Sequence, residues 1–269
     1  MPGILITGGS GYLGAALLRL APEAIGTRFS SAVPLAQLDV RDPGGVNALV
    51  RRIRPEVIIH TAYSTLAEDK WETTTSGAQN VARSAASVGA RLVHLSTDVV
   101  FDGTTGPYRE GDPVNPITAY GRAKADAEQM VMAAHPTALI VRTSLLYGGP
   151  SNEGAQEMLV REALDGDAIS FFTDEIRSPI AVQDLAEAIL ELVPQTVTGV
   201  INVAGPDGIN RHELAGHLAE SLGLSRNELR PASSHGLSTP RPQNCALDST
   251  RAYALLARTP RGVRAVLTV

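Results

Sequence analysis

The chain of 269 residues has one cysteine, no run of basic residues and no apolar stretch long enough to cross a bilayer. Its single thiol, Cys245, cannot form an internal disulfide, which fits a reducing compartment. The net charge of −5 carries no cluster of lysine or arginine, so a nucleic-acid surface is not indicated. A bilayer span needs about 20 consecutive apolar residues, and the first residues, Met1-Pro2-Gly3, are not a basic leader. We therefore expect a cytoplasmic protein without membrane or nucleic-acid partners.

The rest of the composition is that of an ordinary globular protein, with 43% hydrophobic and 19% charged residues. Up to about Arg142, short β-branched runs alternate with longer Ala-rich helical patterns. Strands are predicted at Ile4–Thr7, Ala24–Arg28, Leu35–Asp39, Val57–His60, Arg91–Leu95 and Ala138–Arg142. Helices are predicted at Tyr12–Leu20, Gly45–Ile53, Thr73–Val88 and Thr118–Ala133. This alternation predicts βαβ units and an α/β fold with a doubly wound, Rossmann-type parallel sheet.

The pattern becomes less regular after Gly149. Three helices are predicted at Glu153–Asp165, Val182–Leu192 and Arg211–Leu222, a strand at Val200–Val203 and a last helical stretch near Asp248–Leu256. We expect residues 1–150 to form the Rossmann domain, with part of 178–204 returning to its sheet. Residues 151–269 are expected to form a smaller C-terminal lobe.

A glycine-rich turn joins the first predicted strand to the first helix. The segment ITGGSGYLGAALL places Gly8, Gly9, Gly11 and Gly14 within seven residues. Glycines permit the tight turn, a close backbone approach to a pyrophosphate and close packing of the helix. The helix N-terminus, with Tyr12 and Leu13, supplies free N–H groups and a positive dipole end. In this strand–turn–helix context the spacing predicts a dinucleotide site, against the alternative of a turn without a ligand.

The end of the second predicted strand distinguishes NAD from NADP. An acidic residue there would bind the ribose hydroxyls, whereas an arginine accepts a 2′-phosphate. This chain has Arg28 and Ser30 at that place and no carboxylate. The segment favours NADPH, with NADH possible if Arg28 is only a solvated charge at the strand end.

Two further strand ends carry candidate cofactor residues, because ligands bind at the carboxyl edge of an open parallel sheet. Asp39, followed by Val40, could accept a hydrogen bond from an adenine amino group, or could instead cap the helix that follows Pro43. The segment Thr61–Tyr63 follows the next strand, and the small Ala62 would let a ribose come close. His60 just before it is expected to pack with a satisfied ring rather than act as a base.

Tyr120 and Lys124 lie four residues apart at the beginning of a predicted helix, so they share one face. A nearby ammonium favours the phenolate and lowers the pKa of a tyrosine, which suits it for proton exchange near neutrality. Ser96 and Thr97 follow the strand Arg91–Leu95 and could hold a substrate oxygen. The alternative is that Tyr120 and Lys124 are only a pair on the helix surface. This alternative is less favoured because the glycine turn and the Ser-Thr pair precede them in the order typical of a dinucleotide-dependent site.

Several phrases together resemble the extended short-chain dehydrogenase/reductase superfamily, and within it the dTDP-4-dehydrorhamnose reductase family. The phrases are TGGSGYLG (7–14), HTAY (60–63), STDVVFDG (96–103), PYREGD (107–112), AYGRAK (119–124), RTSLLYGG (142–149), DEIRSP (174–179) and RPQNCALD (241–248). The resemblance runs from Ile4 to about Leu256. Its cofactor and catalytic motifs are more specific than its sugar-contacting positions.

The resemblance implies a role for each matching residue. Tyr120 donates a proton to a ketone oxygen, Lys124 lowers the pKa of that tyrosine and holds the nicotinamide ribose, and Thr97 orients the substrate. The late loops of the family bind the nucleotide diphosphate of the substrate, which makes the C-terminal lobe substrate-binding. The substrate residues expected on this basis are Ser96, Asp98, Arg177 and Arg241, although each arginine could equally be a solvated surface charge.

Three positions depart from the patterns of the superfamily. Related dehydratases have Thr-Asp-Glu, whereas this chain has Val99 after Asp98, which disfavours removal of water. An asparagine of the superfamily's proton relay is replaced by Thr74. The reductase family commonly has an aromatic residue where Leu145 stands, so a stacking surface for the sugar is missing and the substrate need not be 4-keto-rhamnose.

The sequence thus predicts an NADPH-dependent reductase of a 4-keto group on a nucleotide-activated deoxysugar, with no metal and with a homodimer as a family expectation. One alternative is an epimerase of the same superfamily, in which the cofactor is recycled. Another is a non-catalytic NADP-binding protein, because the regulatory β subunit of methionine adenosyltransferase resembles the same family.

Overall fold

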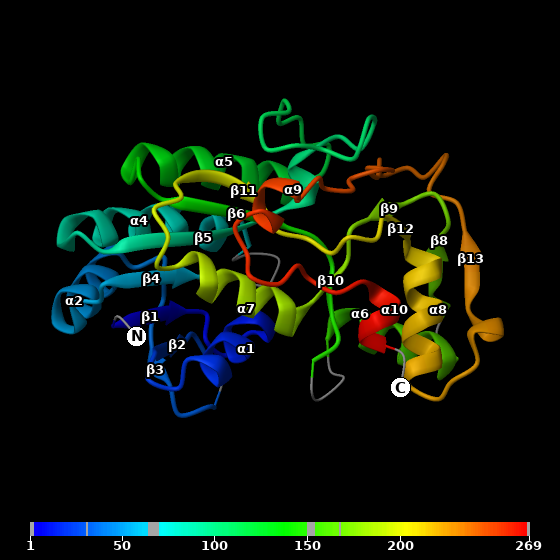
Figure 1. The fold of residues 1–269 in the computed structure, drawn as a ribbon, viewed down its shortest axis with the longest axis horizontal. Coiled ribbons are helices and arrows are strands. Elements are labelled where there is room, and N and C mark those ends of the chain that lie inside the picture. The colour runs from blue at the N-terminus through cyan, green and yellow to red at the C-terminus, as the bar shows by residue number, and fades with distance from the viewer. Residues whose placement is uncertain (1–2, 31, 64–69, 150–153, 167, 268–269) are drawn as a thin grey trace. The chain divides into compact units, whose positions relative to one another are not determined.

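The computed structural model describes residues 3–30, 32–63, 70–149, 154–166 and 168–267 (Figure 1). The chain forms two compact units. The first comprises Met1–Ser96, Ala119–Val141 and Ile189–Ile201, and the second Thr97–Thr118, Arg142–Ala188 and Asn202–Val269. This grouping differs from a division at residue 150, because each unit takes in segments from both sides of that residue.

A seven-stranded sheet organises the first unit within the described chain, in the order β11-β6-β5-β4-β1-β2-β3. Its strands are β1 Ile4–Thr7, β2 Ile25–Arg28, β3 Ala36–Gln37, β4 Val57–His60, β5 Arg91–Thr97, β6 Leu139–Thr143 and β11 Gly199–Asn202. β1 pairs in parallel with both β2 and β4, and the pairs β2–β3 and β4–β5 are also parallel. The predicted Rossmann-type fold is confirmed, and β11 from late in the chain takes one edge.

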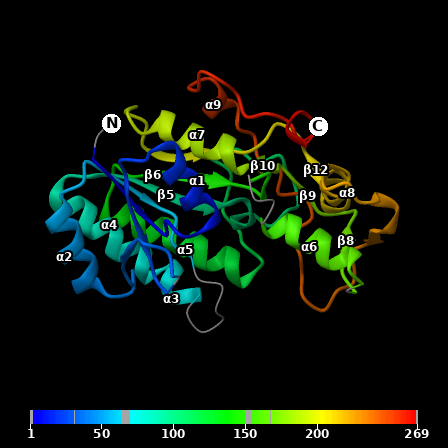
Figure 2. The ribbon, with the colours of Figure 1, turned by 90° about the horizontal axis from the view of Figure 1, so that it is seen from below.

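Helices cover both faces of this sheet. Their bounds are α1 Tyr12–Leu20, α2 Pro43–Ile53, α3 Lys70–Thr74, α4 Ser76–Val88 and α5 Ala119–Ala134. Figure 2 shows α2, α4 and α5 on one face and α1 on the other. Because the strands are covered on both sides, β1 and β4 are buried at every position, which explains their continuous apolar runs. Burial of each large core side chain, such as Leu5 or Ile58, stabilises the fold by about 1.5–3 kcal/mol.

One local prediction was wrong and one open alternative is excluded, and both involve a short polar side chain. The helix expected over Thr73–Val88 is divided into α3 and α4 at Thr75, whose hydroxyl donates to the carbonyl of Trp71 at 2.8 Å. A side chain that bonds to the backbone in this way competes with regular helix geometry. Helix α2 is capped by Asp42, which accepts from the amide of Gly44 at 2.9 Å. Asp39 therefore does not cap α2.

The second unit contains short strand pairs and five helices within its described residues. The helices are α6 Ala155–Leu164, α7 Val182–Leu192, which continues into the first unit, α8 Arg211–Ser221, α9 Thr250–Tyr253 and α10 Val263–Leu267. The strand pairs are β7 Leu146–Tyr147 with β10 Ile180–Ala181, β9 Ile176–Arg177 with β12 Ile209–Asn210, and β8 Ser170–Phe172 with β13 Arg230–Ala232. Single-turn helices of the 3-10 type occur at Asp98–Val100 and Arg226–Glu228. Strands of two or three residues are too short to show a period, so the sequence could not predict them.

Candidate active site

The glycine turn between β1 and α1 has no room for a side chain at Gly8 or Gly14. Gly8 has a φ of +81°, and a Cβ there would lie 2.6 Å from the amide nitrogen of Ala62. A Cβ on Gly14 would lie 2.2 Å from the carbonyl oxygen of Gly8, so α1 packs directly on the turn. Gly11 is the N-cap of α1 and provides no capping side chain. The turn therefore presents backbone at a helix N-terminus, which suits an anion such as a pyrophosphate.

Thr61 and Ala62 follow β4 and lie against the glycine turn. The Thr61 hydroxyl donates to the carbonyl of Thr7 at 2.9 Å, and its amide donates to the same carbonyl at 3.0 Å. These bonds join the end of β4 to the end of β1. The small side chain of Ala62 and the φ of Gly8 together allow the two backbones to approach closely.

The end of β2 carries cationic and aromatic side chains. The Nε of Arg28 is buried and has no hydrogen-bond partner in the described part of the chain. Phe29 is 45% exposed, and the guanidinium of Arg41 lies 5.2 Å from its ring centroid. Ser30 is exposed. A buried guanidinium nitrogen without a partner among the described residues and an exposed serine two residues further along are donors of the kind that bind a phosphate group.

Asp39 and Val40, which the sequence offers as adenine-binding residues, both contact other parts of the protein. The carboxylate of Asp39 forms a bidentate ion pair with Arg41, with Nη2–Oδ2 at 2.8 Å and Nε–Oδ1 at 3.0 Å. These hydrogen bonds lower the pKa of Asp39. Val40 is 4% exposed and packs against Gly77, where a Cβ would lie 2.7 Å from the valine Cγ2. In this arrangement Asp39 orients Arg41, and Arg41 was not expected from the sequence.

Helix α5 holds Tyr120 and Lys124 on one face. Lys124 is 6% exposed, and its Nζ donates to the carbonyl of Leu95 in β5 at 2.9 Å. Burial lowers the pKa of Lys124 to about 8, although the charge of Glu128 opposes this change. Tyr120 is 39% exposed, and its ring meets that of Tyr63 edge to face at 5.4 Å. A buried ammonium one turn from an accessible phenol is the arrangement expected for proton transfer by tyrosine.

Two buried histidines lie on the strands next to Lys124. His60 in β4 and His94 in β5 stack with ring centroids 5.3 Å apart, and Nδ1 of His60 is 2.6 Å from the hydroxyl of Thr7. Burial, and secondarily the charge of Lys124, lower the pKa of His60 to about 3 and also lower that of His94. Both rings are therefore neutral at physiological pH. The prediction that His60 packs with a partner is confirmed.

Ser96, Thr97 and Asp98, expected to face a substrate, make internal contacts. The Ser96 hydroxyl donates to Glu128 at 2.5 Å, and Ser96 is 4% exposed. Thr97 ends β5, is 8% exposed and donates to Asp98 at 3.2 Å. Asp98 accepts from Ser144 at 2.6 Å, and burial raises its pKa. All three side chains thus have protein partners, and Thr97 keeps the largest exposed fraction of the three.

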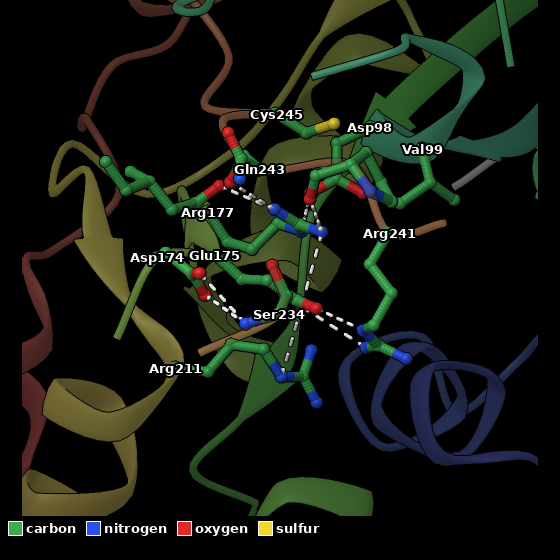
Figure 3. A network of polar contacts seen from close by, with 12 residues as sticks. Asp98, Val99, Asp174, Glu175, Arg177, Arg211, Ser234, Arg241, Gln243 and Cys245 are labelled. Atoms are coloured by element: carbon green, nitrogen blue, oxygen red, sulfur yellow. Dashed lines mark hydrogen bonds and ion pairs between the residues drawn. The ribbon is translucent and has the colours of Figure 1, made fainter. Parts of the chain in front are cut away.

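Glu175 lies at the centre of a polar cluster in the second unit (Figure 3). Its side chain is fully buried and pairs with the guanidinium groups of Arg177, Arg211 and Arg241. Arg177 is 3% exposed and donates to the carbonyls of Ile176, Gln243 and Pro242 at 2.8, 3.1 and 2.8 Å. Its Nε is also 3.8 Å from Asp98. The donors of Arg177 are thus used within the protein, contrary to the expectation of a phosphate ligand.

The two other arginines of this cluster are more accessible. The side chains of Arg241 and Arg211 are 39% and 19% exposed, whereas that of Arg177 is 3% exposed. Arg241 also lies 4.8 Å from the ring centroid of Phe172. Nearby, Cys245 is buried, and its desolvation raises the pKa of the thiol to about 12. Arg211 opens α8 and had no motif around it, so the sequence offered no signal for its position.

Thr74 and Leu145, the two departures from the superfamily pattern, are both inside their units. Thr74 is 2% exposed, and its hydroxyl has no hydrogen-bond partner in the ranges that the structure covers. Leu145 is partly buried against the apolar cluster that includes Tyr147 and Leu214.

In the described parts of the chain, no group of three or more acidic, histidine or cysteine residues could hold a metal ion, and no helix has the length and apolarity of a membrane span.

Comparisons with known proteins agree on one family. The family model described as RmlD substrate binding domain matches residues 1–268. A dTDP-4-dehydrorhamnose reductase of Mycobacterium tuberculosis is 34% identical, over 96% of this chain and 88% of the relative. The methionine adenosyltransferase 2 subunit beta of Xenopus laevis is 31% identical, over 92% and 80%. The crystal structure of dTDP-4-dehydrorhamnose reductase from Bacillus anthracis, in complex with NADP, gives a TM-score of 0.86 at 28% identity, covering 99% of this chain and 97% of that one.

Proposed function

The chain belongs to the RmlD substrate-binding domain family, and from this premise we propose that it is an NADPH-dependent reductase of a 4-keto group on a nucleotide-activated deoxysugar. One observation carries the proposal. Lys124 is buried and held by the carbonyl of Leu95, one helical turn from the accessible phenol of Tyr120. A surface pair on a helix, the alternative interpretation, would leave the lysine solvated.

The glycine turn and the end of β2 are the proposed cofactor site. The contacts that side chains at Gly8 and Gly14 would make explain why the turn has glycine at these two positions. A pyrophosphate would bind at the N-terminus of α1, beside Tyr12 and Leu13, and the orphaned Nε of Arg28 with Ser30 would accept the 2′-phosphate. When bound, a reduced nicotinamide supplies the hydride. The protein supplies position and electrostatics.

In the proposed reaction Tyr120 donates its proton to the ketone oxygen as the carbonyl carbon is reduced. The Lys124 ammonium favours the resulting phenolate and donates to the nicotinamide ribose. Thr97 would hold the substrate oxygen through its hydroxyl. Val99 stands where an elimination would need a glutamate, so the proposal is reduction rather than loss of water.

Arg241 and Arg211 are the better candidates for the diphosphate of the substrate. Both side chains are partly exposed, whereas the guanidinium of Arg177 donates to backbone carbonyl oxygens. The cluster of three arginines with Glu175 and Asp98 carries one excess positive charge if all five groups are ionised, which favours an anion. We therefore assign Arg177 a structural role and the two other arginines the proposed binding role.

The test is to incubate the purified protein with NADPH or NADH and a panel of dTDP-4-keto sugars, following the absorbance of the reduced cofactor. Tyr120→Phe should abolish turnover and leave NADPH affinity within about threefold, because the ring remains and only the proton donor is lost. Conversion of a sugar without net NADPH consumption would indicate an epimerase instead. Absence of turnover with every sugar would contradict the proposal.

A regulatory role is the second candidate, favoured by the 31% identity to a methionine adenosyltransferase 2 subunit beta. In that case the protein would bind the cofactor and a partner protein without reducing a ketone. A Tyr120→Phe variant that preserves both the cofactor affinity and the cellular role of the protein would support this second candidate over the reductase.

A further inference from the structure

Three residues of α5, Tyr120, Lys124 and Glu128, follow one another at intervals of four and therefore share one helix face. The last two each bond to β5. Lys124 donates to the carbonyl of Leu95 at 2.9 Å, and the hydroxyl of the next residue, Ser96, donates to Glu128 at 2.5 Å. Two consecutive residues of the strand thus hold two consecutive turns of the helix.

The buried surroundings of Lys124 disfavour its charged form unless an opposite charge lies nearby. Lys124 and Glu128 are each 6% exposed, so neither charge is fully solvated. Among the described residues, Tyr120 and Glu128 lie one turn to either side of Lys124 on α5, and His60 on β4 and His94 on β5 also interact with its charge. Both imidazoles are neutral at physiological pH, and the ammonium itself helps to keep them so. Glu128 supplies the negative charge that favours the ammonium.

We propose that Glu128, fixed by Ser96, is a positioning residue that keeps the buried Lys124 in its ammonium form and turned toward the Tyr120 face of α5. The proposal rests on the proposed function in one respect, namely that the Lys124 charge is what assists Tyr120 and binds the nicotinamide ribose. The sequence spacing alone would allow Glu128 to be an ordinary surface residue. Its burial and its short bond to Ser96 indicate a different role.

The charge of Glu128 matters because burial already opposes ionisation of Lys124. The pKa of this lysine is lowered from 10.5 to about 8 with the glutamate in place. Removing an opposite charge that lies within one helical turn lowers the pKa of a buried lysine further. A change of about one unit would leave half of the lysines uncharged near pH 7. The assistance to Tyr120 and the contact with the ribose would then be lost at physiological pH.

The chain allows a direct measurement, because Lys70 and Lys124 are its two lysines. Protein labelled with ¹³C,¹⁵N-lysine gives two sets of side-chain NMR signals, and the variant Lys70→Arg assigns them. We expect the Lys124 signals to titrate with a midpoint near pH 8 in the parent protein, as its pKa of about 8 implies. In Glu128→Gln, which conserves the shape of the side chain, the midpoint should fall by at least about half a unit.

Asp126→Asn is the matched control, because Asp126 lies two residues from Glu128 on the same helix and is exposed. Solvent screens its charge, so this variant should leave the Lys124 midpoint within about 0.2 units of the parent value. NADPH affinity, measured by nicotinamide fluorescence against pH, should weaken at a lower pH in Glu128→Gln than in the parent or in Asp126→Asn.

An unchanged Lys124 midpoint in folded Glu128→Gln would overturn the proposal, as would an equal fall in Asp126→Asn. If Glu128→Gln does not fold, Ser96→Ala decides, because it leaves the carboxylate but removes its anchor. A lower Lys124 midpoint in Ser96→Ala supports the proposal, and an unchanged one overturns it. The NMR titration needs no turnover, so an inactive protein with the expected shift would refute the reductase function and leave this proposal standing.

Discussion

Replacement of Arg177 by methionine distinguishes a structural arginine from a phosphate ligand. Methionine fills much of the same space but cannot donate hydrogen bonds or carry charge. The change removes three hydrogen bonds, to the carbonyls of Ile176, Pro242 and Gln243. It also leaves the buried carboxylates of Glu175 and Asp98 without the guanidinium that lies 3.6 and 3.8 Å from them.

The size of the effect follows from the burial of these groups. A hydrogen bond to a charged group contributes about 1.5–3 kcal/mol, but bonds from one side chain are not additive. Removing one partner of a buried ion pair costs about 3–5 kcal/mol, and we expect Arg177→Met to lower the free energy of unfolding by that amount. Since a typical domain is stable by about 5–15 kcal/mol, the variant should unfold at a much lower urea concentration.

The assay pairs urea unfolding with calorimetric titration of dTDP, and Arg241→Met is the control. Arg241 pairs with the same Glu175, but its side chain is 39% exposed, so its loss should cost only about 1 kcal/mol. It should weaken dTDP binding about 10-fold or more, as expected for loss of a charge-assisted bond. The reasoning is refuted if Arg177→Met unfolds within about 1 kcal/mol of the parent and instead loses dTDP affinity.

Further predictions concern the first unit. Gly14→Ala should weaken NADPH binding by at least about 10-fold in calorimetry. The reason is that the added Cβ would lie 2.2 Å from the carbonyl oxygen of Gly8 and displace the turn. Unchanged affinity would mean that the turn does not hold the cofactor. The pKa of Lys124 falls from 10.5 to about 8 on folding, so the folded state binds fewer protons between those values and stability should rise from pH 8 to 10.5. Lys124→Met should remove that rise, and a rise of equal size in the variant would contradict the assignment. With a pKa of about 3, His60 should show no NMR titration between about pH 5 and 8, in contrast to an ordinary histidine. Asp42→Ala should lower the free energy of unfolding by about 0.5–2 kcal/mol through loss of the α2 cap, whereas Asp39→Ala should leave α2 intact.

The elements that the sequence predicted well are those whose pattern is local. β1, β4, α1 and α7 have the predicted bounds, because an apolar run or an amphipathic period determines each of them. The glycine turn could be predicted for a similar reason, because the glycines that its backbone conformation requires are close together in the sequence. The Y-x-x-x-K spacing likewise places Tyr120 and Lys124 on one face without knowledge of the rest of the chain.

The surroundings of charged side chains could not be predicted in this way. Arg177 is enclosed by the carbonyls of Pro242 and Gln243, which lie more than sixty residues further along the chain. Backbone carbonyls are present at every position, so no residue type marks them as partners. For Asp39 the sequence offered an adenine contact or a helix cap, but it gave no sign of the ion pair with Arg41, two residues away. The hydrogen bond from Ser96 to Glu128 depends on how a helix lies on a strand, which the sequence alone does not specify.

Cys245, the single cysteine, gives the second unit a built-in reporter of its own opening. The thiol is buried and ionises only near pH 12, so a thiol-specific reagent at neutral pH meets almost no reactive thiolate while this unit is closed. Labelling then requires a transient opening, and its rate measures how often the environment of Cys245 is exposed. The amide of Cys245 donates at 3.1 Å to the carbonyl of Ile176, the residue between Glu175 and Arg177, in the region that Figure 3 shows. The rate at which the natural thiol is labelled therefore reports on the ion cluster without an engineered probe.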